Sequence, residues 1–154
     1  MKMFIDSNLF IEHSKGNSKA VEILENVLGN REVYINDVVY SEVAYIFIRA
    51  NSGKNYFELK KDRRTVANAG LNFLNKLFPL LRLTKFLEVN ENVIALANDY
   101  IIKYGLLPND ALVLATCKFY EVDCLVSLDE EDFREPCEKE NIRLISDIKV
   151  LNKI

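Results

Sequence analysis

The sequence predicts an α/β fold, in which a three-layer α/β/α sandwich surrounds a mostly parallel five-stranded sheet. Short β-favouring segments alternate along the chain with longer segments whose apolar residues recur at helical spacing. Strands that alternate with helices form βαβ units, and these units build a parallel sheet with helices on both faces. A length of 154 residues, 49% of them hydrophobic, suits one domain over residues 1–154 with its own core.

The individual elements follow from these patterns. The expected strands are residues 2–6, 32–36, 85–89, 124–128 and 142–146. The expected helices are residues 18–28, 37–50, 64–82, 91–104 and 110–120. The helix at 64–82 shows a 4-3-4-3 apolar stripe made of Ala67, Leu71, Leu74, Phe78 and Leu81. The helix at 110–120 is apolar on nearly every side, which predicts burial. A glycine-containing break and a charged stretch precede the helix at 64–82, so we expect a helical insertion at about 53–83.

Composition narrows the function. A net charge of −3 gives no overall electrostatic footprint for nucleic acid. No apolar run reaches the roughly 20 residues that cross a bilayer, and no export signal is evident. Three cysteines without a CxxC pair, Cys117, Cys124 and Cys137, fit a reducing cytoplasm. The single histidine, His13, excludes a two-histidine acid/base mechanism. We therefore expect a cytoplasmic protein that does not contact membranes and whose chemistry relies on carboxylates.

Four acids lie at the ends of expected strands or near the starts of expected helices. Asp6 ends the first strand and Asp129 ends the strand at 124–128, while Asp110 lies in the first turn of a buried helix. Glu42 lies about one turn into the helix that follows the second strand, among apolar neighbours. In an open parallel sheet, strand carboxyl ends and the helix starts after them share one edge, where ligands bind. The four acids are therefore expected to face one crevice.

Helix capping is the structural alternative for three of these acids. Asp6 and Asp129 are reasonable N-caps, and the helix dipole favours Asp110 near a helix start. Capping alone leaves clustered carboxylates that raise one another's pKa. A divalent cation removes this repulsion, and Mg²⁺ takes hard oxygen ligands together with substrate phosphate. The acids thus predict a Mg²⁺ or Mn²⁺ site and phosphate chemistry.

Four stretches together resemble a known family. They are FIDSNLF at 4–10, SEV at 41–43, NDALVLATC at 109–117 and VSLDEEDF at 126–133. Their order and spacing resemble the PIN-domain ribonucleases, especially the VapC-type toxins of toxin–antitoxin pairs. The resemblance covers almost the whole chain. Residues 49–83 form a longer segment than in the shortest family members and have no residue-by-residue match.

The resemblance implies a metal-dependent endoribonuclease that leaves 5′-phosphate and 3′-hydroxyl ends. It implies a catalytic and metal-binding quartet of Asp6, Glu42, Asp110 and Asp129, with Asp132 either binding a second metal or capping a turn. Ser7 and Asn8 would support the first acid, and Ser127 would form a hydrogen bond near the metal. The family also implies an RNA substrate, a small antitoxin partner and a homodimer, for which the helices at 64–82 and 91–104 offer apolar surface.

A basic run is a candidate for RNA binding. It consists of Lys54, Lys60, Lys61, Arg63 and Arg64, with Tyr56 and Phe57 nearby. Basic side chains neutralise phosphates and aromatic rings stack on bases. The alternative, slightly favoured, is a solvated helix face beside a hydrophobic contact.

Two other functions compete with the nuclease. HAD-type phosphatases also place an aspartate after the first strand, but they need an acid two residues later, where this chain has Asn8. A non-catalytic PIN-like domain that binds RNA or protein is the second alternative. Such a module has no need of four clustered carboxylates, which favours the enzyme.

Overall fold

The computed structural model describes residues 1–29 and 32–154 and contains a five-stranded sheet. The strands are β1 (Lys2–Ile5), β2 (Glu32–Asn36), β3 (Lys85–Leu87), β4 (Cys124–Val126) and β5 (Arg143–Ile145). Their order across the sheet is β3-β2-β1-β4-β5, and all four pairings are parallel. The predicted sheet is confirmed and is parallel throughout. Each expected strand lies within two residues of its observed bounds.

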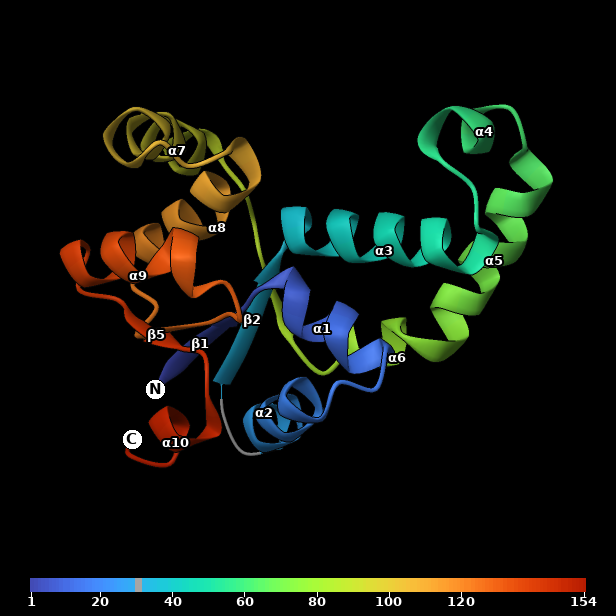
Figure 1. Ribbon diagram of the computed structural model, residues 1–154. Coiled ribbons are helices and arrows are strands. Elements are labelled where there is room, and N and C mark those ends of the chain that lie inside the picture. Colours follow the sequence, from blue (N-terminus) through green and yellow to red (C-terminus); the bar gives the residue numbers. More distant parts are fainter. Residues whose placement is uncertain (30–31) are drawn as a thin grey trace.

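Helices cover both faces of the sheet (Figure 1). They are α1 (Ser7–Ser14), α2 (Ser18–Leu28), α3 (Asp37–Ser52), α4 (Tyr56–Lys60), α5 (Arg63–Lys76), α6 (Phe78–Leu81), α7 (Glu91–Tyr104), α8 (Pro108–Phe119), α9 (Glu130–Lys139) and α10 (Ile148–Leu151). Figure 1 shows α7, α8 and α9 on one side of the sheet and α1, α2 and α6 on the other. The three-layer arrangement is therefore confirmed. None of the helices in residues 1–29 and 32–154 is long and apolar enough to cross a bilayer.

The core includes the central strand β1 and its neighbour β4. Phe4 of β1 pairs in register with Leu125 of β4, and both side chains are fully buried. Strands covered on both faces read as continuous apolar runs, as CLV does in β4. The expected burial of the 110–120 helix is confirmed, since α8 buries nearly every residue from Ala111 to Cys117.

The helical insertion is confirmed, but its internal structure differs from the expectation. The predicted helix at 64–82 divides into α5 and α6, which meet at Leu77. Pro79 in the first turn of α6 lacks the N–H that a continuous helix requires. The expected stripe does not form the buried face of α5, because Leu71 and Leu74 are exposed while Ala69 and Phe73 are buried. Figure 1 shows α3 projecting from the sheet, with α4 at its far end and α5 running back.

The helices α8 and α9 end in the same way. The residue after each C-cap has a left-handed backbone, with φ of 53° at Glu121 and 58° at Asn141. The next N–H then donates to a carbonyl five residues back, as Val122 does to Cys117 at 2.8 Å. This is the hydrogen-bond pattern of a Schellman motif, which turns the chain sharply from helix into strand.

The side chain of Glu140, at the C-terminal end of α9, connects three helices by hydrogen bonds and an ion pair. Its carboxylate, with a side chain only 10% exposed, accepts hydrogen bonds from Tyr104 at 2.5 Å and Lys103 at 3.2 Å, both on α7. It also pairs with Lys118 of α8 at 3.4 Å. One carboxylate at the end of α9 therefore connects α7, α8 and α9.

Candidate active site

The parallel sheet brings the sequence-predicted acids to one edge. Asp6 directly follows β1 and begins α1, while Asp129 follows β4 and begins α9. Asp110 lies in the first turn of α8, and Glu42 lies in the second turn of α3 after β2. All these positions belong to the carboxyl ends of strands or to the helix starts near them, which is the ligand-binding edge of such a sheet.

Asp6 is held by its own loop and by the loop after β4. Its side chain is 5% exposed. Oδ1 accepts the backbone N–H of Ser7 at 2.7 Å, which caps α1. Oδ2 accepts hydrogen bonds from the Ser127 hydroxyl at 2.7 Å and from the Asn8 amide at 3.1 Å. The three expected supporting residues therefore all contact Asp6, and capping and side-chain positioning occur together.

Glu42 is held at both carboxylate oxygens. The Ser7 hydroxyl donates to Oε2 at 2.9 Å, and the Asn109 amide donates to Oε1 at the same distance. Ser7 thus contacts Asp6 and Glu42, which come from different strand–helix units. The sequence interpretation did not include Asn109. Its only signal was its place directly before Asp110 in NDALVLATC.

The start of α9 supplies two further acids. Asp129 caps this helix, since its Oδ1 accepts the backbone N–H of Asp132 at 3.1 Å. The pKa of Asp132 is raised, chiefly by the charge of Asp129 and then by partial burial. Asp132 also acts electrostatically on Asp110, so it lies beside the acid cluster.

The pKa values record this crowding. Burial raises the pKa of Asp6 to about 6 despite the hydrogen bonds from Ser127 and Ser7, and the charges of Glu42 and Asp129 raise it further. Burial likewise raises the pKa of Asp110 to about 7, followed by the charge of Asp6 and of the acids around it. The pKa of Asp110 therefore lies near neutral pH, and that of Asp6 lies below it but well above the ordinary value of 3.8.

Positive charge is missing from this cluster in the described chain. No ion pair in residues 1–29 and 32–154 joins Asp6, Glu42, Asp110, Asp129 or Asp132 to a lysine or arginine. The same residues contain no group of three Asp, Glu, Cys or His side chains that converge as a ready-made metal ligand set.

A second buried pair fastens α3 to α8. The Asn36 amide donates to the Thr116 hydroxyl at 2.8 Å, and both residues are fully buried. Asn36 also caps α3 through the N–H of Val39 at 3.0 Å. Together with the contact between Glu42 and Asn109, this pair fixes the helix that carries Glu42 against the helix that carries Asp110. The pair could not be predicted from the sequence, because its members lie 80 residues apart.

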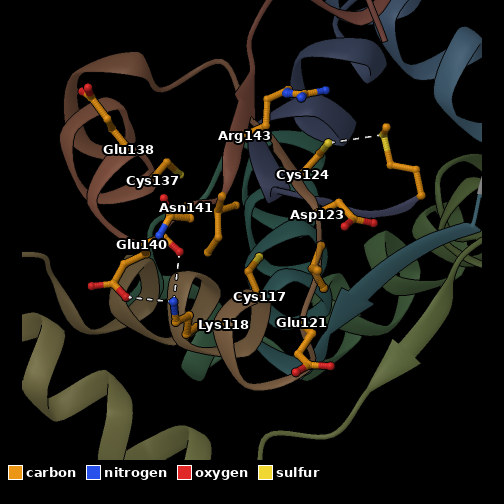
Figure 2. Close-up of a pocket in the computed structure, with 13 residues that line it drawn as sticks. Cys117, Lys118, Glu121, Asp123, Cys124, Cys137, Glu138, Glu140, Asn141 and Arg143 are labelled. Carbon is orange, nitrogen blue, oxygen red and sulfur yellow. Dashed lines mark hydrogen bonds and ion pairs between the residues drawn. The ribbon is translucent and has the colours of Figure 1, made fainter.

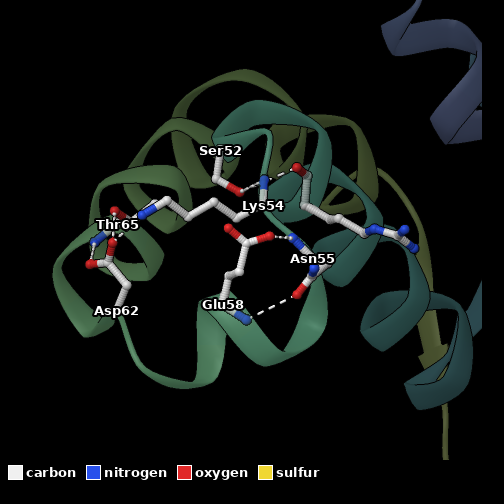
Figure 3. Close-up of polar contacts among 7 residues, drawn as sticks. Ser52, Lys54, Asn55, Glu58, Asp62 and Thr65 are labelled. Carbon is white, nitrogen blue, oxygen red and sulfur yellow. Dashed lines mark hydrogen bonds and ion pairs between the residues drawn. The ribbon is translucent and has the colours of Figure 1, made fainter.

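The basic run lies away from the acids. It occupies the loop after α3, the helix α4 and the start of α5, at the far tip of the projection in Figure 1. Ten residues of α3 separate Glu42 from Ser52, or about 15 Å at the usual helical rise. Lys54 is paired with Asp62, the N-cap of α5, and the capping box of Asn55 and Glu58 lies beside it (Figure 3).

The other basic residues have different surroundings. Lys60 lies over the ring of Tyr56, with its Nζ atom 5.5 Å from the ring centre. Lys61, Arg63 and Arg64 lie beside it in the chain. The structure does not bring the five expected RNA-binding residues into the acid cluster, and their role in RNA binding stays a prediction.

A pocket of about 970 Å³ lies at the opposite edge of the sheet (Figure 2). It is lined by the ends of α8 and α9 and by the starts of β4 and β5. All three cysteines border it and are buried, and burial raises the pKa of the Cys117 and Cys137 thiols. None of the predicted catalytic acids lines this pocket, so volume alone does not identify the active site.

The sequence and the fold of this chain are similar to those of known proteins. A sequence model of the PIN domain matches residues 3–139. The chain belongs to the PIN-domain family. It is 36% identical over 132 residues to Ribonuclease VapC2 of Methanocaldococcus jannaschii, covering 84% of this chain and 86% of that protein. It is 29% identical over 136 residues to Ribonuclease VapC6 of the same organism, covering 84% and 89%.

The PIN fold is also shared with a solved toxin–antitoxin complex from Klebsiella pneumoniae. The two structures superpose with a TM-score of 0.60 at 18% identity, over 85% of this chain and 89% of that one. Identity at this level supports the fold alone.

Proposed function

We propose that this PIN-domain protein is a metal-dependent endoribonuclease and the toxin of a toxin–antitoxin pair. The single observation that carries the proposal is the buried Asp6, held by Ser7, Asn8 and Ser127 within electrostatic reach of Glu42 and Asp129. The relatedness to two VapC ribonucleases supports the substrate class. In this proposal, residues 1–154 act as one nuclease domain.

The donor chemistry fits a divalent cation. Every charged side chain in the cluster offers hard carboxylate oxygens, which suit Mg²⁺ or Mn²⁺. Burial raises the pKa of Asp6 and of Asp110, and the negative charge of the neighbouring acids raises both further, which a bound cation would oppose. Asp6, Asp110 and Asp129 would hold the ion, with Glu42 and Asp132 completing the set. When bound, the ion activates water and neutralises charge on the phosphoryl oxygens.

The side chains around the acids fix the positions of two carboxylates. Ser127 and Asn8 fix Oδ2 of Asp6, while Ser7 and Asn109 fix the two oxygens of Glu42. In the hydrolysis, a water oxygen forms a bond to phosphorus, and the bond from phosphorus to the 3′ oxygen breaks. The attacking water releases one proton and the departing 3′ oxygen takes up one, so the products are a 3′ hydroxyl and a phosphate that stays on the 5′ side.

The Asp6→Asn variant tests this proposal. The amide keeps the size of the side chain and can still accept hydrogen bonds, but it carries no charge, so RNA cleavage with Mn²⁺ should fall by more than about a thousandfold while circular dichroism stays unchanged. Asp99→Asn, an exposed change on α7, is the matched control and should cleave normally. Wild-type cleavage rates in the Asp6→Asn protein would show that the centre is wrongly assigned.

The partner belongs to the same proposal. The structure that shares this fold in Klebsiella pneumoniae is a toxin–antitoxin complex. Exposed apolar side chains on the projection, including Phe57, Leu71 and Leu74, offer surface for an antitoxin or a second copy in the cytoplasm. Co-expression with the product of a short neighbouring reading frame should relieve growth arrest and yield a complex by size-exclusion chromatography.

A further inference from the structure

A separate groove adjoins the acid cluster on the α3 side. Its volume is about 370 Å³. It is lined by Asp37, Val38, Ser41, Glu42, Val89 and Asn109. Glu42 and Asn109 belong both to this groove and to the hydrogen-bond network of the acid cluster. Whatever fills the groove therefore lies next to the position where phosphate chemistry would occur.

The lining does not suit a phosphate. It contains two carboxylates, Asp37 and Glu42, and no Lys, Arg or His among the described residues. A phosphate oxygen placed there would meet like charge and no compensating donor cation. Val38 and Val89 contribute aliphatic walls, which accept the flat face of a neutral group.

The polar groups of the groove are mainly acceptors. In the described chain, no side chain or backbone N–H donates to the carboxylate of Asp37, the hydroxyl oxygen of Ser41 or Oδ1 of Asn109. The Asn109 amide nitrogen is already engaged at Glu42. A ligand that satisfies this set must bring N–H donors on a small, mostly flat body.

We propose that the groove binds one nucleobase of the RNA, next to the scissile phosphate, and selects a base with an exocyclic amino group. The inference rests on the proposed ribonuclease function. Cytosine, adenine and guanine each offer an amino donor, which carboxylates and amide oxygens accept, whereas uracil offers oxygens there. The groove volume suits one base with its sugar, and recognition relies on hydrogen bonds because no aromatic ring lines it.

Short RNAs test this selection. Four otherwise identical uridine oligonucleotides carry A, C, G or U at one internal position, and cleavage beside it is measured as kcat/KM with Mn²⁺. We expect wild-type protein to cut beside at least one amino-bearing base at least about fivefold faster than beside uridine. Asp37→Asn adds an amide donor and should reduce that preference at least threefold, while Asp99→Asn leaves it unchanged.

A second variant fills the groove. Ser41 is exposed on α3, so Ser41→Phe should fold and should raise KM with little change in kcat on the preferred RNA. Ala50→Phe places the same ring on an exposed position of the same helix outside the groove and is the matched control. Equal effects of the two substitutions would overturn the inference.

Binding measurements separate this inference from the proposed activity. Fluorescence anisotropy with the inactive Asp6→Asn protein measures affinity for the same four RNAs. Base-dependent affinity that Asp37→Asn reduces supports the groove even if wild-type protein cuts no RNA, in which case only the nuclease proposal fails. Equal affinities for all four RNAs, unaffected by Asp37→Asn, overturn the groove. Loss of antitoxin binding in Ser41→Phe with unchanged RNA selection would assign the groove to a protein partner and also overturn it.

Discussion

The amide of Asn109 donates to Oε1 of Glu42 at 2.9 Å, which joins the first turn of α8 to the second turn of α3. The hydroxyl of Ser7 occupies the other oxygen of the same carboxylate. Glu42 is therefore oriented by two elements that the chain supplies 35 residues before it and 67 residues after it. Its position depends on the assembled fold and not on α3 alone.

Asn109→Ala should loosen Glu42. A hydrogen bond to a charged group contributes about 1.5–3 kcal/mol, and this one is exposed to solvent, so kcat/KM and the affinity for Mn²⁺ should each fall about tenfold. Mn²⁺ affinity is measured by thermal shift, and Asn98→Ala on the exposed face of α7 is the control. Asn109→Gln keeps the amide and should recover part of the loss. Unchanged Mn²⁺ affinity in Asn109→Ala would exclude a positioning role.

The metal-free protein should lose stability as the pH rises from about 4 to about 7. The pKa values of Asp6 and Asp110 are raised from 3.8 to about 6 and about 7, chiefly by burial, so the folded state binds more protons than the unfolded chain in this window. Their stabilising contribution is present below about pH 4 and is lost as they ionise. Thermal unfolding in EDTA across this range measures the loss.

Two variations of the thermal unfolding experiment test whether the acid cluster causes this pH dependence. Mn²⁺ binds the ionised form, so added Mn²⁺ should raise Tm most at the upper end of the window. Asp110→Asn cannot ionise and should flatten the metal-free profile. A profile for Asp110→Asn that runs parallel to that of wild type would assign the pH dependence to other groups.

Glu140 should matter at acid pH. Burial opposes its ionisation, but the hydrogen bonds from Tyr104 and Lys103 prevail and lower its pKa from 4.5 to about 2. Its contribution is therefore present above about pH 4.5 and is lost as the pH falls toward 2. Glu140→Gln should lower the free energy of unfolding at pH 7 by about 2 kcal/mol, since it removes hydrogen bonds to a charged group.

A surface ion pair supplies the control for Glu140. Glu135 pairs with Lys139 on the outer face of α9, and its side chain is 71% exposed. Glu135→Gln should change urea-induced unfolding much less than Glu140→Gln. If the two substitutions lowered the free energy of unfolding equally, Glu140 would not stabilise the contacts among α7, α8 and α9.

Glu121→Gly should stabilise the fold. Glu121 has a left-handed backbone that costs most residues about 1–2 kcal/mol, and glycine adopts it without that cost. Because glycine also gains freedom in the unfolded chain, the net increase in the free energy of unfolding should be about 1 kcal/mol. Urea-induced unfolding measures it. Asn141→Gly should gain less, since asparagine tolerates this backbone, and a destabilised Glu121→Gly protein would contradict the argument.

Much of this fold could be predicted from the sequence, because the patterns that indicate its helices and strands each span only a few residues. Glu42 was identifiable from its apolar neighbours, and the structure buries Val39 and Val43 on either side of it. Pro79 indicates the break between α5 and α6 at Leu77. The apolar spacing across residues 64–82 instead predicted a single helix. The exposure of Leu71 and Leu74 depends on where the projection packs, which periodicity does not encode.

The candidate site was predictable in its acids but not in its supports. Asp6, Asp110 and Asp129 follow strands or begin helices, so topology alone brings them to one edge. The partners of Asn36 and Asn109 come from residues 80 and 67 positions away, and no pattern in one sequence pairs them. Short polar side chains of this kind read as helix caps until the tertiary contacts are known.

The hydrogen bond from Ser127 to Asp6 joins residues 121 positions apart, and β4 pairs with β1 beside it. During translation, Asp6 is synthesised early, long before most of the residues that contact it. Its hydroxyl partner and the last two acids arrive only after α8 and β4 have been synthesised. Contacts of such high sequence separation also form slowly. Unfinished chains therefore lack the assembled centre, so the cell that makes this protein is exposed to its chemistry only after synthesis is nearly complete.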